Sequence, residues 1–467
     1  MRSLFYSPDR WFYTLAYGFI ALPLVIFLAI KVPAFQVPDE DSHFARAYQI
    51  THGEFFPTKR ELPNKAGNFT VGGTVDKGIF KASGGYRYLI FRPDLKVDSE
   101  KTKNADGVQW GKDAWQDTRN VSIYPPLHYS ISALGIVIGK SLNMTITDTL
   151  KLSRLMNGVI AVLLIMVALF TLKRGAGIFF VVLMLPMSLS QIASTSQDAI
   201  CIASAALCVA FISSINDEMS SVQRRVILTV SSILLLVIAT ARPPYIALAL
   251  FYLYYAFLYR NHDHLRNGLL VAFMGSLFAV ILWSVYVATF VSVPFGPEGV
   301  DYKGQALFIL HSPIIWLHIF IESWLQRWGF YAVSFVANLG HLDTSFPSYY
   351  YWLAALTLFC ASLAGILNSK RTENSRPWQE SIIALTIIII AVLGIYAVLY
   401  ISWSPLKNPI IEGAQGRYLI PVALFLSLCA SRNIVICRRE LGCRVIILCF
   451  SITTFFITPF VILTRYY

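Results

Sequence analysis

A cluster of ionisable residues follows the first apolar run of the chain, in Gln36-Val-Pro-Asp-Glu-Asp-Ser-His-Phe-Ala-Arg-Ala-Tyr48. Three carboxylates, a histidine and an arginine fall between positions 39 and 46. If the segment after Pro38 is helical, Asp39, His43 and Arg46 share one face. Such a face could place a carboxylate base beside a cation that positions a phosphate. The alternative is a helix cap, although a cap does not need three acids together with a histidine and an arginine.

Three further polar clusters lie where apolar runs end. In Ser194-Thr-Ser-Gln-Asp198, the aspartate either caps the next helix or supplies a second acid. In Arg242-Pro-Pro-Tyr245, the arginine either reaches lipid headgroups or binds a lipid phosphate through two hydrogen bonds. In Glu412-Gly-Ala-Gln-Gly-Arg-Tyr418, Arg417 stands beside backbone amides that the glycines expose. That arrangement suits a phosphate or diphosphate, or else an ordinary helix N-terminus.

The composition places these clusters in a membrane protein. Of 467 residues, 56% are hydrophobic and 14% charged, against about 25% charged in soluble domains. The first apolar run, 11–33, has no cleavage site and is expected to be an anchor. The net charge of +12 comes mainly from residues between apolar runs, which indicates topology and excludes nucleic-acid binding. The seven cysteines lie in or beside apolar runs without metal-binding spacing, which indicates small apolar fillers.

Apolar runs predict about eleven spanning helices, which must position the polar clusters. The twelfth apolar segment, 126–142, is ambiguous. If it lies along the membrane surface, thirteen basic residues share one side and four the other, so the first side is cytoplasmic. If it crossed, that bias would reverse. The expected spans are 11–33, 152–172, 175–193, 199–215, 225–241, 244–259, 267–291, 349–367, 379–402, 418–431 and 442–463.

This topology predicts two large periplasmic segments. The first, 34–150, follows the first span; its part 58–116 is rich in Gly, Lys, Asp and Asn and is expected to form irregular or short β structure. Spans two to seven occupy 151–291. The second outer segment, 292–348, contains the tryptophan-rich stretch 306–335, expected to be a helix along the membrane surface. Spans eight to eleven occupy 349–467.

All four polar clusters fall on the outer side in this topology, whereas unrelated capping motifs would occur on both sides. The asymmetry indicates a catalytic site at the outer membrane boundary that handles a phosphate-bearing lipid. In their order along the chain, these clusters and Tyr124-Pro-Pro-Leu127 resemble a bacterial domain-of-unknown-function family of predicted membrane proteins. The resemblance runs over most of the chain.

The same layout is similar to the GT-C superfamily of membrane glycosyltransferases, an all-α polytopic fold. The resemblance implies that Asp39 is the catalytic carboxylate, with Glu40 beside it, and that Asp198 is a second acid. It also implies that Tyr124 to Leu127 open a surface helix. Tyr124 departs from the aminoarabinose transferases of that superfamily, which have a phosphate-binding lysine there. Phosphate contact is therefore expected from elsewhere. The implied substrate-binding residues are His43, Arg46, Tyr124, Asp198, Arg242, Tyr245, Gln415 and Arg417.

The resemblance implies a sugar donor linked to undecaprenyl phosphate in the outer leaflet of the bacterial inner membrane. Asp39 would deprotonate an acceptor hydroxyl of an envelope glycan such as O-antigen, with inversion at the sugar. No cofactor is expected, although a carboxylate pair beside phosphates could recruit a divalent ion. The rival functions are an O-antigen polymerase or ligase, which takes diphosphate-linked glycans, and a transporter or flippase. Transporters place ionisable residues at the bilayer midplane, where these spans have almost none.

Overall fold

The long apolar runs of the sequence form long helices. The computed structural model describes residues 8–61, 69–293, 296–367, 377–430 and 438–467. Within these residues six helices are long and apolar enough to cross a membrane. They are α1 (Pro8–Lys31), α6 (Ile146–Thr171), α10 (Ser221–Ala241), α12 (Asp263–Tyr286), α16 (Pro377–Trp403) and α18 (Arg438–Tyr466).

Several predicted spans are shorter or broken. The predicted span 175–193 forms two helices because Pro186 has no amide hydrogen to continue the first of them. The predicted spans at 199–215, 244–259 and 418–431 form a 16-residue helix and two runs that mix 3-10 and α turns. The structure therefore does not confirm eleven spans. The elements are α7 (Ala176–Met184), α8 (Pro186–Ile192), α9 (Asp198–Ser213), α11 (Leu250–Leu258), α15 (Ser348–Leu367), α17 (Ile420–Ala423) and 3-10 segments Pro243–Ala249, Gly416–Leu419 and Leu424–Cys429.

The predicted surface helix 306–335 is two helices, α13 (Tyr302–His311) and α14 (Pro313–Val336). They meet at an angle of 107°, so the pair is either a broken span, which would be the seventh, or a re-entrant segment. The break follows from Pro313, which disfavours helical backbone at the residue before it. A short hairpin of β4 (Asn338–Leu339) and β5 (Thr344–Ser345) follows.

The segment between the first two long helices forms a small α/β unit. Strands β1 (Thr58–Glu61), β2 (Phe69–Asp76) and β3 (Asp113–Asp117) make an antiparallel sheet in that order, with Gly72 opposite both Thr58 and Asp117. The short strands agree with the expectation for 58–116, whereas its two helices were not predicted. The helices of the unit are α2 (Glu40–Thr51), α3 (Lys77–Gly84), α4 (Ser99–Asp106) and α5 (Ser130–Ser141), with 3-10 segments Arg87–Leu89 and Pro126–Tyr129.

Helix α5 lies within the ambiguous segment 126–142. It has 12 residues and so is about 18 Å long, too short to cross a hydrocarbon core of about 30 Å. It packs against α6 and α2. Its length agrees with the prediction that this segment does not span.

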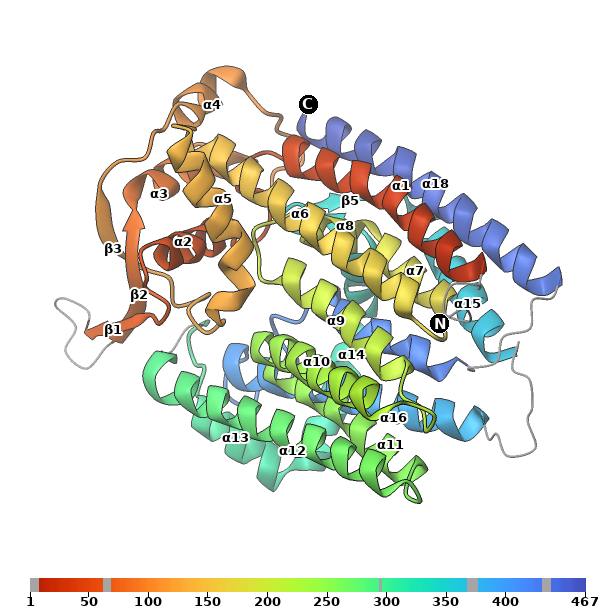
Figure 1. Cartoon of the computed structure of the whole chain (residues 1–467). Coiled ribbons are helices and arrows are strands. Elements are labelled where there is room, and N and C mark those ends of the chain that lie inside the picture. The colour runs from red at the N-terminus through yellow and green to blue at the C-terminus, as the bar shows by residue number, and fades with distance from the viewer. Residues whose placement is uncertain (1–7, 62–68, 294–295, 368–376, 431–437) are drawn as a thin grey trace.

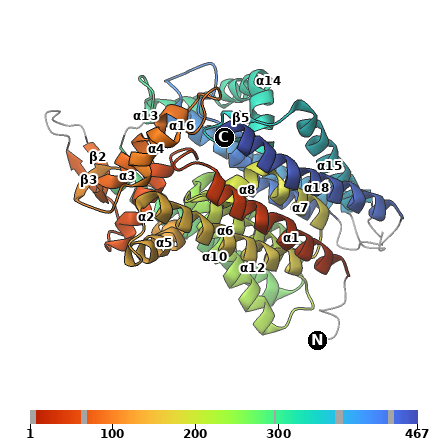
Figure 2. The same cartoon turned by 90° about the horizontal axis from the view of Figure 1, so that it is seen from above.

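The sheet and helices α2 to α5 gather at one end of the bundle, where α1 ends (Figure 1). We call this the α2 end. Helices α1 and α18 run side by side in both views (Figure 2). At the α2 end, Tyr467 Oη donates to the carbonyl of Lys31 at 3.1 Å.

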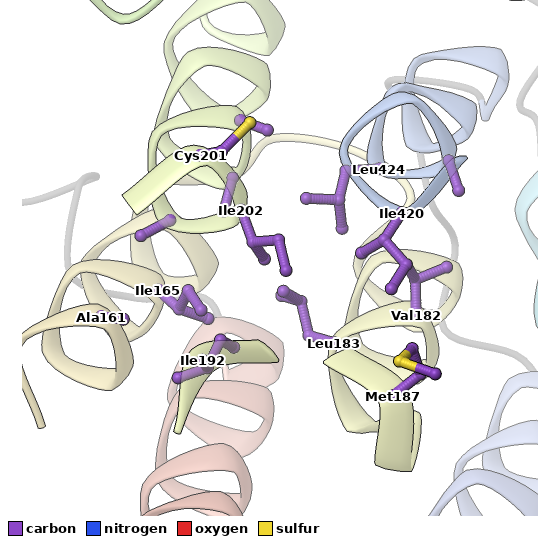
Figure 3. Packing of buried hydrophobic residues seen from close by; sticks show 14 of the residues in the cluster. Ala161, Ile165, Val182, Leu183, Met187, Ile192, Cys201, Ile202, Ile420 and Leu424 are labelled. Atoms are coloured by element: carbon purple, nitrogen blue, oxygen red, sulfur yellow. The ribbon is translucent and has the colours of Figure 1, made fainter. Parts of the chain in front are cut away.

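Aliphatic side chains pack together in the part of the core between α7, α9 and the segment 420–424. Figure 3 shows Leu183 of α7, Ile202 of α9 and Leu424 among its side chains, each at most 1% exposed. Six cysteines in the described residues are free thiols, of which Cys201 and Cys208 are buried as expected for apolar fillers and Cys449 is exposed; Cys437 lies outside the described residues. This core lies next to the start of α9, which carries Asp198, and to the start of α17, which follows Arg417.

Candidate functional site

Asp39 stands just before α2 and is exposed. Its backbone is left-handed, with φ 57° and ψ 17°, a conformation that is uncommon for residues other than glycine. Its side chain makes no capping hydrogen bond to α2. Asn120 Nδ2 donates to Asp39 Oδ1 at 3.4 Å, a long contact. The carboxylate is therefore held on the surface without being used as a helix cap.

Glu40 points the other way, into the protein. Its carboxylate accepts hydrogen bonds from Arg154 Nε at 2.8 Å and from Arg154 Nη2, and both side chains are fully buried. Arg154 also donates to the carbonyls of Val32, at 2.7 Å, and Pro33, at 3.1 Å, just after α1. The structure therefore places Glu40, which the sequence predicted to stand beside the catalytic carboxylate, in a buried ion pair. The pair ties the turn carrying Asp39 to α1 and α6.

His43 lies one helical turn after Asp39 and is buried. Its Nδ1 is 2.8 Å from the hydroxyl of Tyr129. Burial lowers the pKa of His43, and the charges of Asp39 and Asp198 oppose that shift only in part. His43 is therefore a neutral hydrogen-bonding group at pH 7. The ring of Tyr124 lies 6.1 Å from the ring of His43, and burial raises the pKa of Tyr124, so its phenol stays protonated.

An ion pair joins two of the predicted clusters. Arg242 Nη1 donates to Asp198 Oδ1 at 2.7 Å, and both side chains are largely buried. The guanidinium of Arg242 lies 4.4 Å from the ring centroid of Tyr418. Tyr245 Oη donates to the carbonyl of Tyr418 at 2.6 Å. These contacts hold α9, the segment after α10 and the 3-10 turn Gly416–Leu419 together, and they neutralise the charge of Arg242.

Arg417 is the second cation of the cluster. Its Nε donates to Gln415 Oε1 at 2.7 Å, and its Nη1 lies 3.5 Å from Gln191 Oε1. Among the described residues no ion pair with a carboxylate is found for Arg417. Its charge acts on both His43 and Asp198. Arg417 is therefore the cation of this cluster that is available for an anionic ligand.

Arg46 does not join the cluster. It is fully buried and donates to Gln49 Oε1 at 2.9 Å and to the carbonyls of Glu54 and Phe55. Asp39, His43 and Arg46 therefore do not share one face of α2, contrary to the prediction from the sequence. Asp39 lies outside the helix, His43 meets Tyr129, and Arg46 closes the turn after α2. No group of three or more His, Cys, Asp or Glu side chains suited to a metal lies in the described part of the chain.

The model of a family described as "Predicted membrane protein (DUF2142)" matches residues 22–426. The chain belongs to this family. No curated protein matched, and no solved structure matched. All ten predicted site residues of this DUF2142 chain fall within the matched range.

Sequence reasoning missed several residues that hold the site of this DUF2142 protein. Arg154 could have been found from the sequence, because an arginine inside a predicted span is expected to have a buried partner. Gln191 is likewise a polar residue in an apolar run. Tyr129 and Asn120 could not have been found from the sequence, because only the fold brings them to His43 and Asp39.

His128, in the 3-10 segment beside this cluster, predicts a dependence of stability on pH. Its Nε2 is 3.0 Å from the carbonyl of Val237, and burial lowers the pKa of His128 to about 4. Near pH 5 the unfolded chain, with a histidine pKa of about 6.5, binds a proton that the folded chain does not. Stability should therefore fall as pH falls from 6.5 toward 4, by about 2 kcal/mol at pH 5 from this residue. Thermal unfolding across this range, monitored by tryptophan fluorescence, measures it.

The matched variant is His128→Gln, which keeps an amide donor near the position of Nε2. It should unfold with a shallower pH dependence than the wild type, with the remaining slope coming from His43 and other groups. If the stability of His128→Gln depended on pH as strongly as that of the wild type, His128 would not be the source of the predicted effect.

Gly416 predicts a second stability effect. A Cβ at this position would overlap the carbonyl oxygen of Tyr331 and the amide nitrogen of Phe335, which are backbone atoms of α14. Gly416→Ala should therefore push the turn carrying Arg417 away from α14 and lower stability by about 1–3 kcal/mol. Thermal unfolding measures the loss. Gly442→Ala in α18 is the control, because nothing lies within 4 Å of its Cβ. Equal stability of both variants would contradict the packing of Gly416 on α14.

Proposed function

We propose that this protein is a membrane glycosyltransferase that uses a sugar linked to a polyprenyl phosphate, undecaprenyl phosphate in bacteria. The proposal rests on one arrangement: the exposed carboxylate of Asp39 lies beside a buried polar cluster in which Arg417 is a cation without a carboxylate partner among the described residues. In this proposal the α2 end faces the periplasm. The acceptor is a hydroxyl of an envelope glycan.

The chemistry assigned to these groups is an inverting displacement. Asp39 takes the proton of the acceptor hydroxyl as the hydroxyl oxygen attacks the anomeric carbon of the sugar. The bond between that carbon and the phosphate oxygen breaks, and the lipid phosphate leaves with the electron pair. Arg417 stabilises the phosphate through its remaining N–H groups. Neutral His43 and Tyr124 offer hydrogen bonds to the sugar.

Asp198 and Arg242 have a different part in this proposal. Because they neutralise each other at 2.7 Å, neither is a free acid or a free cation. Their ion pair, with Tyr245 beneath it, fixes Tyr418 and therefore the adjacent Arg417. We assign Asp198, Arg242 and Tyr245 to positioning.

The proposal is tested by sugar transfer in membranes that contain the protein. Radiolabelled undecaprenyl-phosphate glucose and other monophosphate-linked sugars are supplied, and label in the host surface polysaccharide is measured. Transfer that depends on the protein supports the proposal. Transfer only from diphosphate-linked glycans would assign a polymerase or ligase instead, and no transfer from either donor class would remove the proposed activity.

A further inference from the structure

Helix α14 separates two apolar cavities that are open to the surface of the bundle, where Trp328 is 63% exposed. The first, of about 330 Å³, lies between α14, α16 and the segment 419–426. The second, of about 550 Å³, lies between α14, α15 and the strand β5. Trp328, Ala332 and Phe335 line both cavities, so the two adjoin across one stretch of α14.

The first cavity begins beside Arg417. Leu419, two residues further along the chain, lines it. The turn that carries Arg417 packs directly on α14, where Gly416 N donates to Ser334 Oγ at 2.8 Å. Tyr331, which also lines the cavity, has its carbonyl oxygen against Gly416. The cation and the wall of the cavity are therefore parts of one rigid unit.

From there the first cavity reaches residues near the middle of α16. Its lining continues from Leu419 to Leu426 and includes Val392 and Ile388 of α16. Helix α16 ends at Trp403, so Ile388 lies about 22 Å along the helix from that end. A lipid whose phosphate is at Arg417 would have its chain in this direction.

We propose that the two cavities hold, one after the other, the isoprenoid chain of a lipid phosphate whose phosphate is bound by Arg417. This inference rests on the proposed function and names the binding site for the lipid part of its donor. Only the first cavity is lined by the segment that begins at Leu419, close to Arg417, and it shares Trp328, Ala332 and Phe335 with the second cavity. A single chain that enters the first cavity from Arg417 can therefore continue past these shared side chains into the second. A glycerophospholipid would instead present two chains from one headgroup. Trp324, Trp328 and Phe335 supply flat aromatic surfaces for a methyl-branched chain.

The test is binding of undecaprenyl phosphate, without a sugar, to the full-length protein in detergent, measured by native mass spectrometry. Ala332→Phe places a ring in the wall shared by the cavities. Leu325→Phe makes a similar change on the same helix at a side chain that is 67% exposed and lines neither cavity. We expect Ala332→Phe to weaken binding by about tenfold or more and Leu325→Phe to leave it unchanged.

Three outcomes would overturn the inference. The first is equal binding by Ala332→Phe and the wild type while both remain folded by thermal unfolding. The second is displacement of undecaprenyl phosphate by phosphatidylglycerol at equal concentration, which would show a general lipid site. The third is that Arg417→Gln binds the lipid as tightly as the wild type, which would place the phosphate elsewhere.

These results are distinct from the outcome of the transfer assay. Lipid binding that is sensitive to Ala332→Phe, with no sugar transfer from any donor, would support the cavities and reject the proposed glycosyltransferase. Transfer that depends on Asp39 but is unaffected by Ala332→Phe would support the enzyme and reject the cavities as its lipid site.

Discussion

Replacing Asp39 by asparagine should lower sugar transfer by about 10²- to 10⁴-fold, the range expected when a general base is removed. An amide cannot take the acceptor proton, although it has nearly the shape of the carboxylate. Folding should change little, because Asp39 is exposed, caps no helix and has one long hydrogen bond from Asn120. The measurement is the initial rate of transfer from radiolabelled undecaprenyl-phosphate glucose in membranes matched for protein content.

Asp41→Asn is the matched control for this experiment. Asp41 lies two residues away, and its carboxylate accepts from Ser83 Oγ at 2.9 Å and lies 3.9 Å from Arg87. Its variant should transfer sugar nearly as fast as the wild type. If both variants lost activity equally, the loss would come from the structure of the turn and not from a catalytic base. If Asp39→Asn retained the wild-type rate, Asp39 would not be the base.

The convergence of the polar clusters could be predicted from the sequence. Asp198, Arg242 and Arg417 come from three segments far apart in the chain, and the fold brings their charges together. The physical reason is general: polar side chains in an apolar chain are stable only at the ends of its helices or against one another. The count of charges in the connecting loops assigns these ends to one side of the membrane, and that sidedness stays a prediction.

The lengths of the helices could not be predicted from hydropathy. The run 175–193 has the composition of a span, but Pro186 divides it, and the run 244–259 begins inside a 3-10 segment whose first two residues are Pro243 and Pro244. The run 175–193 is apolar because the protein surrounds it: its residues from Ile178 to Ile192 are buried. Hydropathy does not separate burial in protein from burial in lipid.

The separate roles of Asp39 and Glu40 were also beyond sequence reasoning. The two carboxylates are neighbours, and a helix starting at Asp39 would have placed both near the surface. The left-handed backbone at Asp39 instead turns Glu40 inward to Arg154, a residue 114 positions later. To predict which of two neighbouring acids is buried, one must know which of them has a cation as its partner. Here the cation is Arg154, and it reaches Glu40 only because α6 packs against α1.

The ion pair between Glu40 and Arg154 predicts the largest effect on stability. Arg154→Met would leave the Glu40 carboxylate buried without a cation and would remove the donors to the carbonyls of Val32 and Pro33. Breaking a fully buried pair from one side costs about 3–5 kcal/mol. The unfolding transition of the variant in detergent, monitored by tryptophan fluorescence, should therefore shift strongly to lower temperature. Arg92→Met, which breaks an exposed pair with Asp94, should leave the transition unchanged.

The double variant Glu40→Gln with Arg154→Met separates the pair from the rest of the site. Because the amide that replaces the Glu40 carboxylate is neutral and needs no cation, the double variant should be less destabilised than the sum of the single variants. Strict additivity would show that the two side chains do not depend on each other. The double variant should still transfer sugar slowly even where it is fully folded, because the strained turn at Asp39 would have lost the contacts that hold it. Stability recovered without activity would identify this pair as the support of Asp39, the proposed catalytic carboxylate.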